Sequence, residues 1–242
     1  MSQTRPNVLV VDDEPDICAN LCDILTDLGY PVDVAHNGEE ALQLVRKKPY
    51  AVALLDLRMP GMDGLELYRQ IKLVQSATVA IIVTAYSSSE TVTQALHAGA
   101  WKVVRKPVEL GRLLPLIEEA AEQPLVLVVD DDTELCETMW ELLREQGFRV
   151  ALAHDSRMAR HCLEQAAAHV VLIDMRLPQG NGAEVFHMVR AAAPQSKTIL
   201  ITGYRSEVAE MVQQAQAAGA DAVCYKPFDV RSLLETVSRL SG

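Results

Sequence analysis

The stretch VLVVDDEPDIC at Val8–Cys18 decides the fold, because the chain contains it twice. It returns as VLVVDDDTELC at Val126–Cys136, 118 residues later. The stretch LLDLRMPGMDG at Leu54–Gly64 returns at the same distance as LIDMRLPQGNG at Leu172–Gly182. A repeat of about 120 residues is too long for a solenoid and has the size of a domain. The sequence therefore predicts one domain used twice.

The boundary between the two copies lies just before the second apolar run. We predict a first domain at residues 1–122, a linker at residues 123–124 and a second domain at residues 125–242. The proline at position 124 ends the preceding helix, because a proline restricts the residue before it to extended conformations.

Short apolar runs alternate with helical periodicity in each half. In the first half the predicted strands are Val8–Val11, Val32–Ala35, Ala51–Leu55, Val79–Val83 and Lys102–Val104. After the first strand, apolar residues recur at helical spacing from Ile17 to Leu28, and Gly29 ends the helix. Strands that alternate with helices are typical of a doubly wound α/β domain with a parallel sheet.

Composition excludes several classes of protein. The 242 residues carry 22 basic and 33 acidic side chains, a net charge of −11, which argues against direct nucleic-acid binding. Five cysteines without a CxxC pair predict neither a disulfide framework nor a zinc site. The apolar runs are far shorter than the ~20 residues of a membrane helix, and the N-terminus does not resemble a signal peptide. We therefore expect a cytoplasmic protein without membrane contact.

Acidic residues follow the first and third predicted strands of each half. They are Asp12, Asp13 and Asp56 in the first half and Asp130, Asp131 and Asp174 in the second. Ligands of doubly wound sheets bind at the carboxyl ends of the strands, so the three acids of each half are expected to converge. Three carboxylates repel one another unless a divalent cation or a basic side chain neutralises them. The pattern predicts a site for Mg²⁺, or for Mn²⁺, in each domain.

Other repeated residues supply the remaining polar groups. Lys106 and Lys226 each end the fifth strand and precede a proline, and a cis lysine–proline bond would direct the lysine back toward the acids. Thr84 and Thr202 end the fourth strand and offer a hydroxyl to a bound oxyanion. The repeated His36 and His154 lack metal-ligand spacing and are interpreted as surface or rim residues.

Each half thus has five polar positions in the same order, which in the first half are Asp12, Asp13, Asp56, Thr84 and Lys106. These positions, matched twice, resemble those of the response-regulator receiver domain, the phosphoacceptor module of two-component signalling. The resemblance spans nearly the whole chain. It implies two flavodoxin-like (βα)5 domains, each with a five-stranded parallel sheet in the strand order 2-1-3-4-5. This order is one of the two common ways of winding a parallel sheet with helices on both faces.

The resemblance also implies a role for each position. The phosphoacceptors would be Asp56 and Asp174. The metal ligands would be these two, Asp13, Asp131 and the backbone carbonyls of Arg58 and Arg176, with Asp12 and Asp130 bound through water. A phosphoryl oxygen would be bound by Thr84 and Thr202, and the phosphoryl group would pair with Lys106 and Lys226.

The function implied is that of a response regulator in a phosphorelay. The phosphodonor would be a histidine kinase or a histidine phosphotransfer protein, and an unknown downstream protein would read the phosphorylated state. Only self-phosphorylation and self-dephosphorylation are expected, so the chain is not predicted to be an enzyme. The repeats can pack as an internal pseudo-dimer or each pair with another chain.

Two features depart from the family pattern. Val103 and Val223 stand where receivers often carry an aromatic switch residue, three positions before the lysine. Bulky residues follow the phosphoacceptors and threonines by two positions, and could obstruct attacking water: Arg58, Tyr86, Arg176 and Tyr204. The hypothesis is a phosphoaspartate that hydrolyses slowly.

Other interpretations remain open. Two receivers account for the whole chain and leave no output domain, but the same sequence fits a receiver segment of a larger hybrid histidine kinase or regulator. An aspartate-dependent phosphatase is disfavoured, because Arg58 and Arg176 stand where such enzymes usually have a second acid. A scaffold with one silent receiver also fits. A merely solvated acidic cluster is disfavoured, because the complete set occurs twice.

Overall fold

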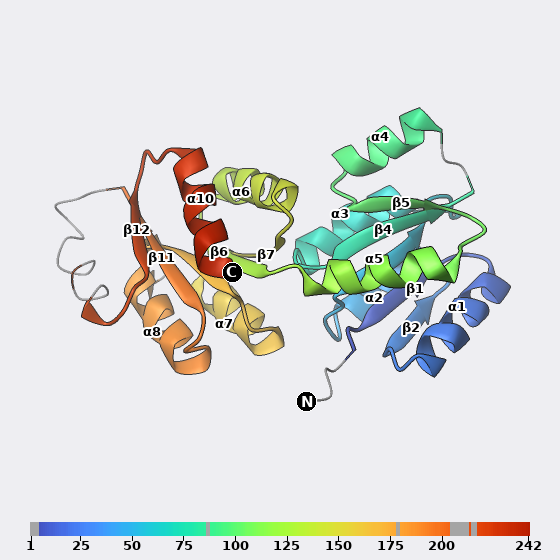
Figure 1. Cartoon of the computed structure of the whole chain (residues 1–242), viewed down its shortest axis with the longest axis horizontal. Helices are drawn as coiled ribbons and strands as arrows, with labels where there is room; N and C mark the ends of the chain where they lie inside the picture. Colours follow the sequence, from blue (N-terminus) through green and yellow to red (C-terminus); the bar gives the residue numbers. More distant parts are fainter. Residues whose placement is uncertain (1–4, 86–87, 178–179, 204–212, 214–216) are drawn as a thin grey trace. The chain divides into compact units, whose positions relative to one another are not determined.

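The chain divides into two compact units, Met1–Gln123 and Pro124–Gly242. In the computed structural model, residues 5–85, 88–177, 180–203, 213 and 217–242 are described. Each unit contains a five-stranded sheet with helices on both faces (Figure 1). Helix α5 ends at Glu122 and strand β6 begins at Leu125, so two residues separate the last helix of the first unit from the first strand of the second.

The first unit alternates strands and helices throughout. Its elements are β1 Val8–Val11, α1 Pro15–Asp27, β2 Val32–Ala35, α2 Gly38–Val45, β3 Val52–Asp56, α3 Gly64–Val74, β4 Val79–Thr84, α4 Ser89–His97, β5 Lys102–Arg105 and α5 Leu110–Glu122. All neighbouring strands are parallel, in the order β2-β1-β3-β4-β5. The predicted doubly wound fold is confirmed.

Three predicted strands end too early. Strand β3 includes Asp56, which pairs with Val83, and strand β4 includes Thr84, which pairs with Arg105 at the end of β5. The backbone groups of a ladder pair whatever the polarity of the side chain, so hydrophobicity alone places the end of a strand one residue short. Asp56 and Thr84 are therefore held by the sheet itself.

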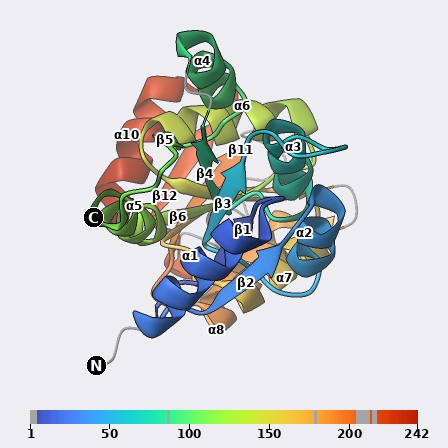
Figure 2. The same ribbon diagram turned by 90° about the vertical axis from the view of Figure 1, so that its right-hand side faces the viewer.

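Helices α1 and α5 cover one face of the first sheet, and α2 and α3 cover the other (Figure 2). The core of the first face consists of apolar side chains from β1, β3 and β4 that pack against Leu21 and Leu25 of α1 and Leu113 and Ile117 of α5. Helix α1 is followed by Gly29, whose φ of 84° is a left-handed conformation that glycine adopts without strain. The chain can therefore turn directly into β2.

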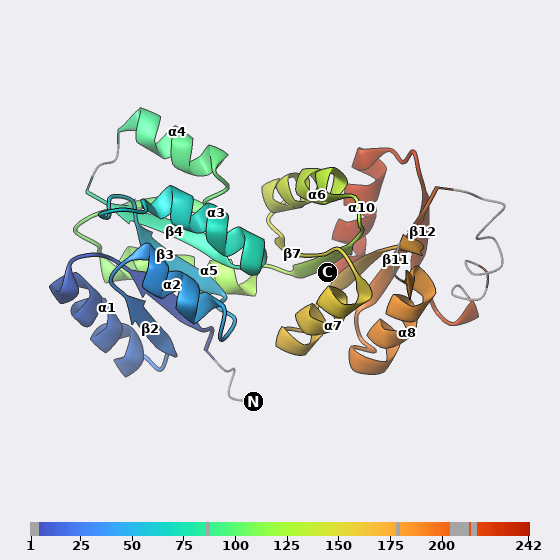
Figure 3. The same cartoon turned by 180° about the vertical axis from the view of Figure 1, so that it is seen from behind.

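The second unit repeats this arrangement. Its elements are β6 Leu125–Val129, α6 Thr133–Glu145, β7 Arg149–Ala153, α7 Ser156–Gln165, β8 Val170–Asp174, β9 Arg176–Leu177, β10 Gly180–Asn181, α8 Gly182–Ala192, β11 Lys197–Thr202, β12 Ala222–Tyr225 and α10 Val230–Ser241. The parallel sheet has the order β7-β6-β8-β11-β12, which matches that of the first unit. Helices α6 and α10 lie on one face and α7 and α8 on the other (Figure 3).

One feature of the second unit is not predicted from the sequence. The short strands β9 and β10 pair antiparallel directly after the sheet strand β8. Among the described residues, none of the helices combines the length and the apolar character that crossing a membrane requires.

Candidate functional site

The acids of the second unit meet at the carboxyl edge of its sheet. Asp130 follows β6 and Asp174 ends β8, and these two strands are parallel neighbours. Asp130 and Asp174 are 1% and 6% exposed, whereas Asp131 is exposed. One carboxylate oxygen from each of the three lies within 4.8 Å of those of the other two. The predicted convergence of the acids is therefore present.

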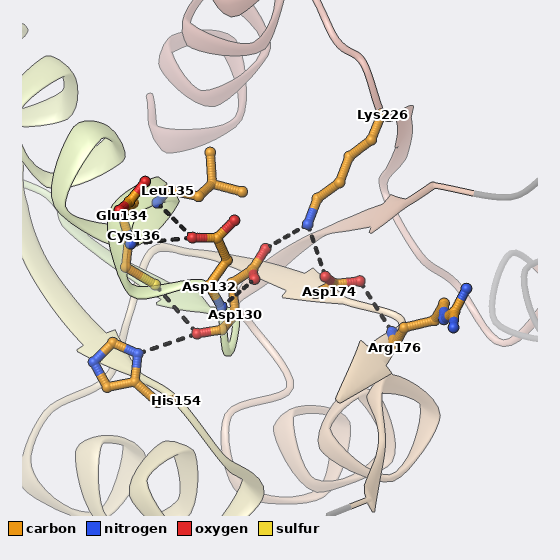
Figure 4. Close-up of polar contacts among 9 residues, drawn as sticks. All are labelled: Asp130, Asp132, Glu134, Leu135, Cys136, His154, Asp174, Arg176 and Lys226. Atoms are coloured by element: carbon orange, nitrogen blue, oxygen red, sulfur yellow. Dashed lines mark hydrogen bonds and ion pairs between the residues drawn. The ribbon is translucent and has the colours of Figure 1, made fainter. Parts of the chain in front are cut away.

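Lys226 neutralises two of these carboxylates. Its Nζ lies 2.8 Å from Asp130 Oδ2 and 2.8 Å from Asp174 Oδ2 (Figure 4). The Lys226–Pro227 bond is cis, as is the Lys106–Pro107 bond of the first unit. A main-chain hydrogen bond from Lys226 N to Thr202 O, at 2.7 Å, fixes the end of β12 beside β11.

Main-chain amides bind the other oxygens of the same carboxylates. Asp132 N donates to Asp130 Oδ1, and Arg176 N donates to Asp174 Oδ1, each at 2.9 Å. Each buried carboxylate thus receives one amide and one ammonium hydrogen bond. Charge-assisted hydrogen bonds of this kind are stronger than neutral ones, and they fix the orientation of the two carboxylates.

The Thr202 hydroxyl is a buried polar group at the end of β11. Thr202 is fully buried, and within the part of the chain that the structure describes its Oγ1 makes no hydrogen bond. Buried hydroxyls are nearly always paired, so this group is suited to an incoming oxygen acceptor. Its position at the end of β11, between Asp174 and Lys226 in the strand order, fits the predicted oxyanion contact.

The first unit builds the same core of the site. Lys106 Nζ lies 2.7 Å from Asp12 Oδ2 and 3.0 Å from Asp56 Oδ1. Glu14 N donates to Asp12 Oδ1 at 3.0 Å, and Arg58 N donates to Asp56 Oδ2 at 2.9 Å. Asp12 and Asp56 are buried. Asp13 is exposed, and Thr84 is buried at the end of β4.

Burial and ion pairing have opposite effects on the pKa values of the acids and lysines in these clusters. Burial raises the pKa of Asp56 above its ordinary value, although hydrogen bonding to Lys106 opposes the shift. Burial likewise raises the pKa of Asp130. For both lysines, burial favours the neutral amine, but hydrogen bonds to the paired carboxylates outweigh burial and raise the pKa. Both lysines therefore stay cationic at neutral pH.

Two glycines shape the sites, and the sequence reasoning did not single them out. A Cβ on Gly64 would lie 2.1 Å from the carbonyl oxygen of Asp56, and one on Gly182 would lie 2.3 Å from that of Asp174. Each glycine begins the helix after the phosphoacceptor candidate and lets that helix approach the strand closely. Both copies of the repeated motif end in glycine, and this recurrence indicates that the position requires a residue without a side chain.

The predicted rate-tuning residues are only partly described. Arg58 and Arg176 are exposed, and Figure 4 shows the Arg176 side chain directed away from Asp174 while its main-chain nitrogen donates to that carboxylate. Tyr86 and Tyr204 lie outside the described residues. Val103 and Val223, at the position of the aromatic switch, are half-buried in β5 and β12.

The donor set of the acidic site fits a hard divalent cation. Asp130, Asp131 and Asp174 offer carboxylate oxygens at close range, and such oxygens are the ligands that Mg²⁺ prefers. Soft ligands are not part of this group, because the nearby Cys136 thiol is buried and donates to the main-chain oxygen of Asp130 at 3.2 Å. The residues therefore suit Mg²⁺ better than zinc.

Comparison with known proteins agrees with this geometry. A response regulator receiver protein of Anaeromyxobacter sp. (strain Fw109-5) is 34% identical over 232 residues, which are 96% of this chain and 94% of that protein. The transcriptional regulatory protein ZraR of Klebsiella oxytoca is 39% identical over 120 residues, 50% of this chain. GlrR of Escherichia coli (strain K12) is 27% identical over 223 residues, 90% of this chain. The chain spans 27% of ZraR and 47% of GlrR.

Several solved structures match one domain of this chain. A CheY-like receiver domain protein from Methanospirillum hungatei JF-1 is 32% identical, with a TM-score of 0.47, over 49% of this chain and 94% of that one. The regulator TrrA of Thermotoga maritima, solved in complex with Mg²⁺-BeF, is 35% identical, with a TM-score of 0.44, over 48% of this chain and 98% of that one.

The family described as "Response regulator receiver domain" matches residues 8–118 and again residues 126–238. These two segments contain both acidic sites and nearly all of both sheets. The chain belongs to the response regulator receiver family of two-component signalling, and carries its domain twice.

Proposed function

We propose that this chain is a tandem-receiver response regulator of a phosphorelay, in which Asp56 and Asp174 each accept a phosphoryl group. One observation carries the proposal. In both units the ammonium of a partly buried lysine lies within 3.0 Å of two buried carboxylates at the carboxyl edge of a parallel sheet. With a divalent cation on the carboxylates, the ion and the ammonium together would attract an anionic phosphoryl group, and this arrangement is built twice from the same motif.

The phosphodonor would be a phosphohistidine of a histidine kinase or of a histidine phosphotransfer protein, the donors that receiver domains generally use. A carboxylate oxygen of Asp56 or Asp174 attacks phosphorus and forms an O–P bond. The P–N bond breaks, and its electron pair stays on the donor's imidazole nitrogen. Phosphoryl transfer needs positioning and charge neutralisation more than covalent chemistry from the protein.

Residues around each phosphoacceptor supply that neutralisation. Lys226 moves from its carboxylate partners to the new phosphoryl oxygens. The Thr202 hydroxyl, which has no hydrogen-bond partner among the described residues, donates a hydrogen bond to one of these oxygens. Lys106 and Thr84 have these roles in the first domain. Movement of the threonine toward the phosphoryl group would link phosphorylation to the conformation of the chain that follows β4 and β11.

Receiver domains generally bind Mg²⁺ at the acidic pocket. In the second domain Asp131, Asp174 and the backbone carbonyl of Arg176 would hold the ion, with Asp130 bound through water. In the first domain the corresponding ligands would be Asp13, Asp56, the Arg58 carbonyl and Asp12. The ion would neutralise phosphoryl oxygens during transfer.

The reaction is expected to stop at the chain's own aspartates. An arginine occupies the position two residues after each phosphoacceptor, and its guanidinium cannot act as a general acid at neutral pH. We therefore propose signalling through contacts with a downstream protein and not turnover of an external phosphate ester. The five cysteines are free thiols, which is consistent with a place in the reducing cytoplasm.

Intact-mass measurement after incubation with acetyl phosphate and Mg²⁺ tests the proposal. The wild-type chain should gain two phosphoryl groups, Asp56→Ala and Asp174→Ala should each gain one, and the double variant none. One group on the wild-type chain would leave a single working receiver, and none would overturn the proposal. Sustained hydrolysis of an added phosphate ester would favour a phosphatase instead.

We also propose that Arg58 and Arg176 slow hydrolysis of the phosphoaspartate, since each lies two residues after a phosphoacceptor and has an exposed side chain. Arg58→Gly should shorten the lifetime of the label on Asp56 several-fold and leave that on Asp174 unchanged. Loss of label within seconds from the wild-type chain, unaffected by Arg58→Gly, would contradict this.

A further inference from the structure

The loop acid Asp130 has one contact that its counterpart Asp12 lacks in the described structure. His154 follows β7, and its Nδ1 lies 3.1 Å from the main-chain oxygen of Asp130. A carbonyl oxygen only accepts hydrogen bonds, so Nδ1 carries the proton and donates. Figure 4 shows the His154 ring and the Lys226 ammonium on opposite sides of Asp130.

The other hydrogen bonds around these two acids are the same. Asp130 N donates to Ala153 O at 3.1 Å, and Cys136 Sγ donates to Asp130 O at 3.2 Å. In the first domain Asp12 N donates to Ala35 O at 3.2 Å, and Cys18 Sγ donates to Asp12 O at 3.3 Å. The histidine contact is thus a difference within an otherwise repeated network.

The first domain has a histidine at the equivalent position, but in another orientation. His36 is exposed, and its main-chain nitrogen donates to Glu40 Oε2 at 2.8 Å. No hydrogen bond from its side chain is found among the described residues of this domain. The chain therefore provides its own matched control for the contact of His154.

The carbonyl of Asp130 belongs to the planar peptide unit that joins Asp130 to Asp131. A second donor on its oxygen restricts the rotation of that unit and so the direction from which the Asp131 side chain leaves the backbone. In this domain the oxygens of Asp130, Asp131 and Asp174 lie within 4.8 Å of one another. Among the described residues, the acids of the first domain form no group that close.

We propose that His154 is a positioning residue for the divalent-cation site of the second domain, which it prepares through the peptide unit of Asp130 and Asp131. The inference rests on the proposed function in one respect, that these acids hold Mg²⁺. It implies that the second domain binds Mg²⁺ more tightly than the first.

Calorimetric titration with Mg²⁺ alone tests this inference on the full chain. An Asp13→Ala background leaves the second site to be measured, and an Asp131→Ala background leaves the first. In the Asp13→Ala background, His154→Leu should weaken Mg²⁺ binding about three- to tenfold, the effect of one lost hydrogen bond. His154→Asn keeps a donor near the position of Nδ1 and should restore most of the affinity.

The controls separate positioning from general stability. His36→Leu in the Asp131→Ala background should leave Mg²⁺ binding by the first domain unchanged. Circular dichroism should show that the His154 variants are folded at the temperature of the titration. The proposal is overturned if His154→Leu binds Mg²⁺ as the parent does, if His154→Asn binds no better than His154→Leu, or if the parent second site binds no Mg²⁺.

The proposed function is judged separately, because the titration contains no phosphodonor. A chain that shows the expected Mg²⁺ affinities but gains no mass from acetyl phosphate would sustain the role of His154 and overturn the phosphoacceptor role. A chain that is phosphorylated on both aspartates but is insensitive to His154→Leu in Mg²⁺ binding would do the reverse.

Discussion

The lysine of the first acidic site is more enclosed than that of the second. The Lys106 side chain is 14% exposed, and its Nζ also lies 3.7 Å from Glu14 Oε1. The Lys226 side chain is 28% exposed and contacts Asp130 and Asp174. The two sites have the same acids, threonine and lysine, so other residues nearby determine how strongly each lysine is bound.

Helix capping explains part of this difference. Glu14 and Asp132 occupy equivalent positions, at the N-caps of α1 and α6. The short Asp132 side chain accepts hydrogen bonds from the amides of Glu134 and Leu135. Glu14 makes no such side-chain cap, and its longer carboxylate reaches toward Lys106. The carboxylate of Asp132 is thus engaged at the end of its helix, whereas that of Glu14 is available to Lys106.

The largest effect on stability is expected at Gly64 and Gly182, where the two domains have the same close contact. Gly64→Ala and Gly182→Ala should each destabilise the affected domain by about 3 kcal/mol, because the new Cβ would overlap the carbonyl oxygen of Asp56 or Asp174. Urea denaturation measures the change. Gly111→Ala is the control, since its Cβ would meet nothing within 4 Å and helix propensity favours alanine by up to about 1 kcal/mol. Equal stability of all three variants would contradict the described close approach.

Substitution of the lysines should affect the stability of the two domains to different extents. Lys106→Met and Lys226→Met leave buried carboxylates without their cation, which should cost about 1–3 kcal/mol, with the greater loss for the more enclosed Lys106. Fluorescence can follow each domain, because the two tryptophans, Trp101 and Trp140, lie in different domains. Saturating Mg²⁺ should reduce both losses. A greater loss for Lys226→Met would reverse the comparison.

Exchange of the two cap residues tests the capping explanation. Asp132→Glu should destabilise the second domain by about 1 kcal/mol, because two amides of α6 lose their acceptor. Glu14→Asp should stabilise the first domain by less, since Pro15 at the first helical position already needs no partner. Urea denaturation with the same tryptophan reporters measures both. Opposite signs are expected, and equal signs would show that the cap does not control the difference.

The pH dependence of stability should show the smallest effect. Burial raises the pKa of Asp56, so between the ordinary carboxyl pKa near 4 and the raised value the folded chain binds more protons than the unfolded chain. In that window this residue lowers the free energy of unfolding as pH rises. Asp56→Asn removes the effect, so its stability relative to wild type should increase with pH and then level off. A relative stability that does not change with pH, measured without metal, would contradict the raised pKa.

The sequence predicts the architecture well, because the fold depends on patterns that recur in the chain. Apolar runs at Val8–Val11 and Val126–Val129 are typical of buried strands, and the helical spacing after them indicates a helix with one packed face. Parallel strands bring their carboxyl ends to one edge, so the convergence of Asp12 with Asp56 follows from their places at the ends of strands. The prediction of His154 as a rim residue missed its contact with Asp130.

By itself the sequence determined the duplication, the α/β class and the residues of both acidic sites, because periodicity and repeated motifs are local properties of the chain. The tertiary structure decided which groups are in contact. The inward contact of His154 against the exposed His36, the reach of Glu14 to Lys106 and the close approach at Gly64 depend on side-chain direction and on distances between separate elements. Such distances are set by packing, and residues that are identical in both copies can therefore have different surroundings.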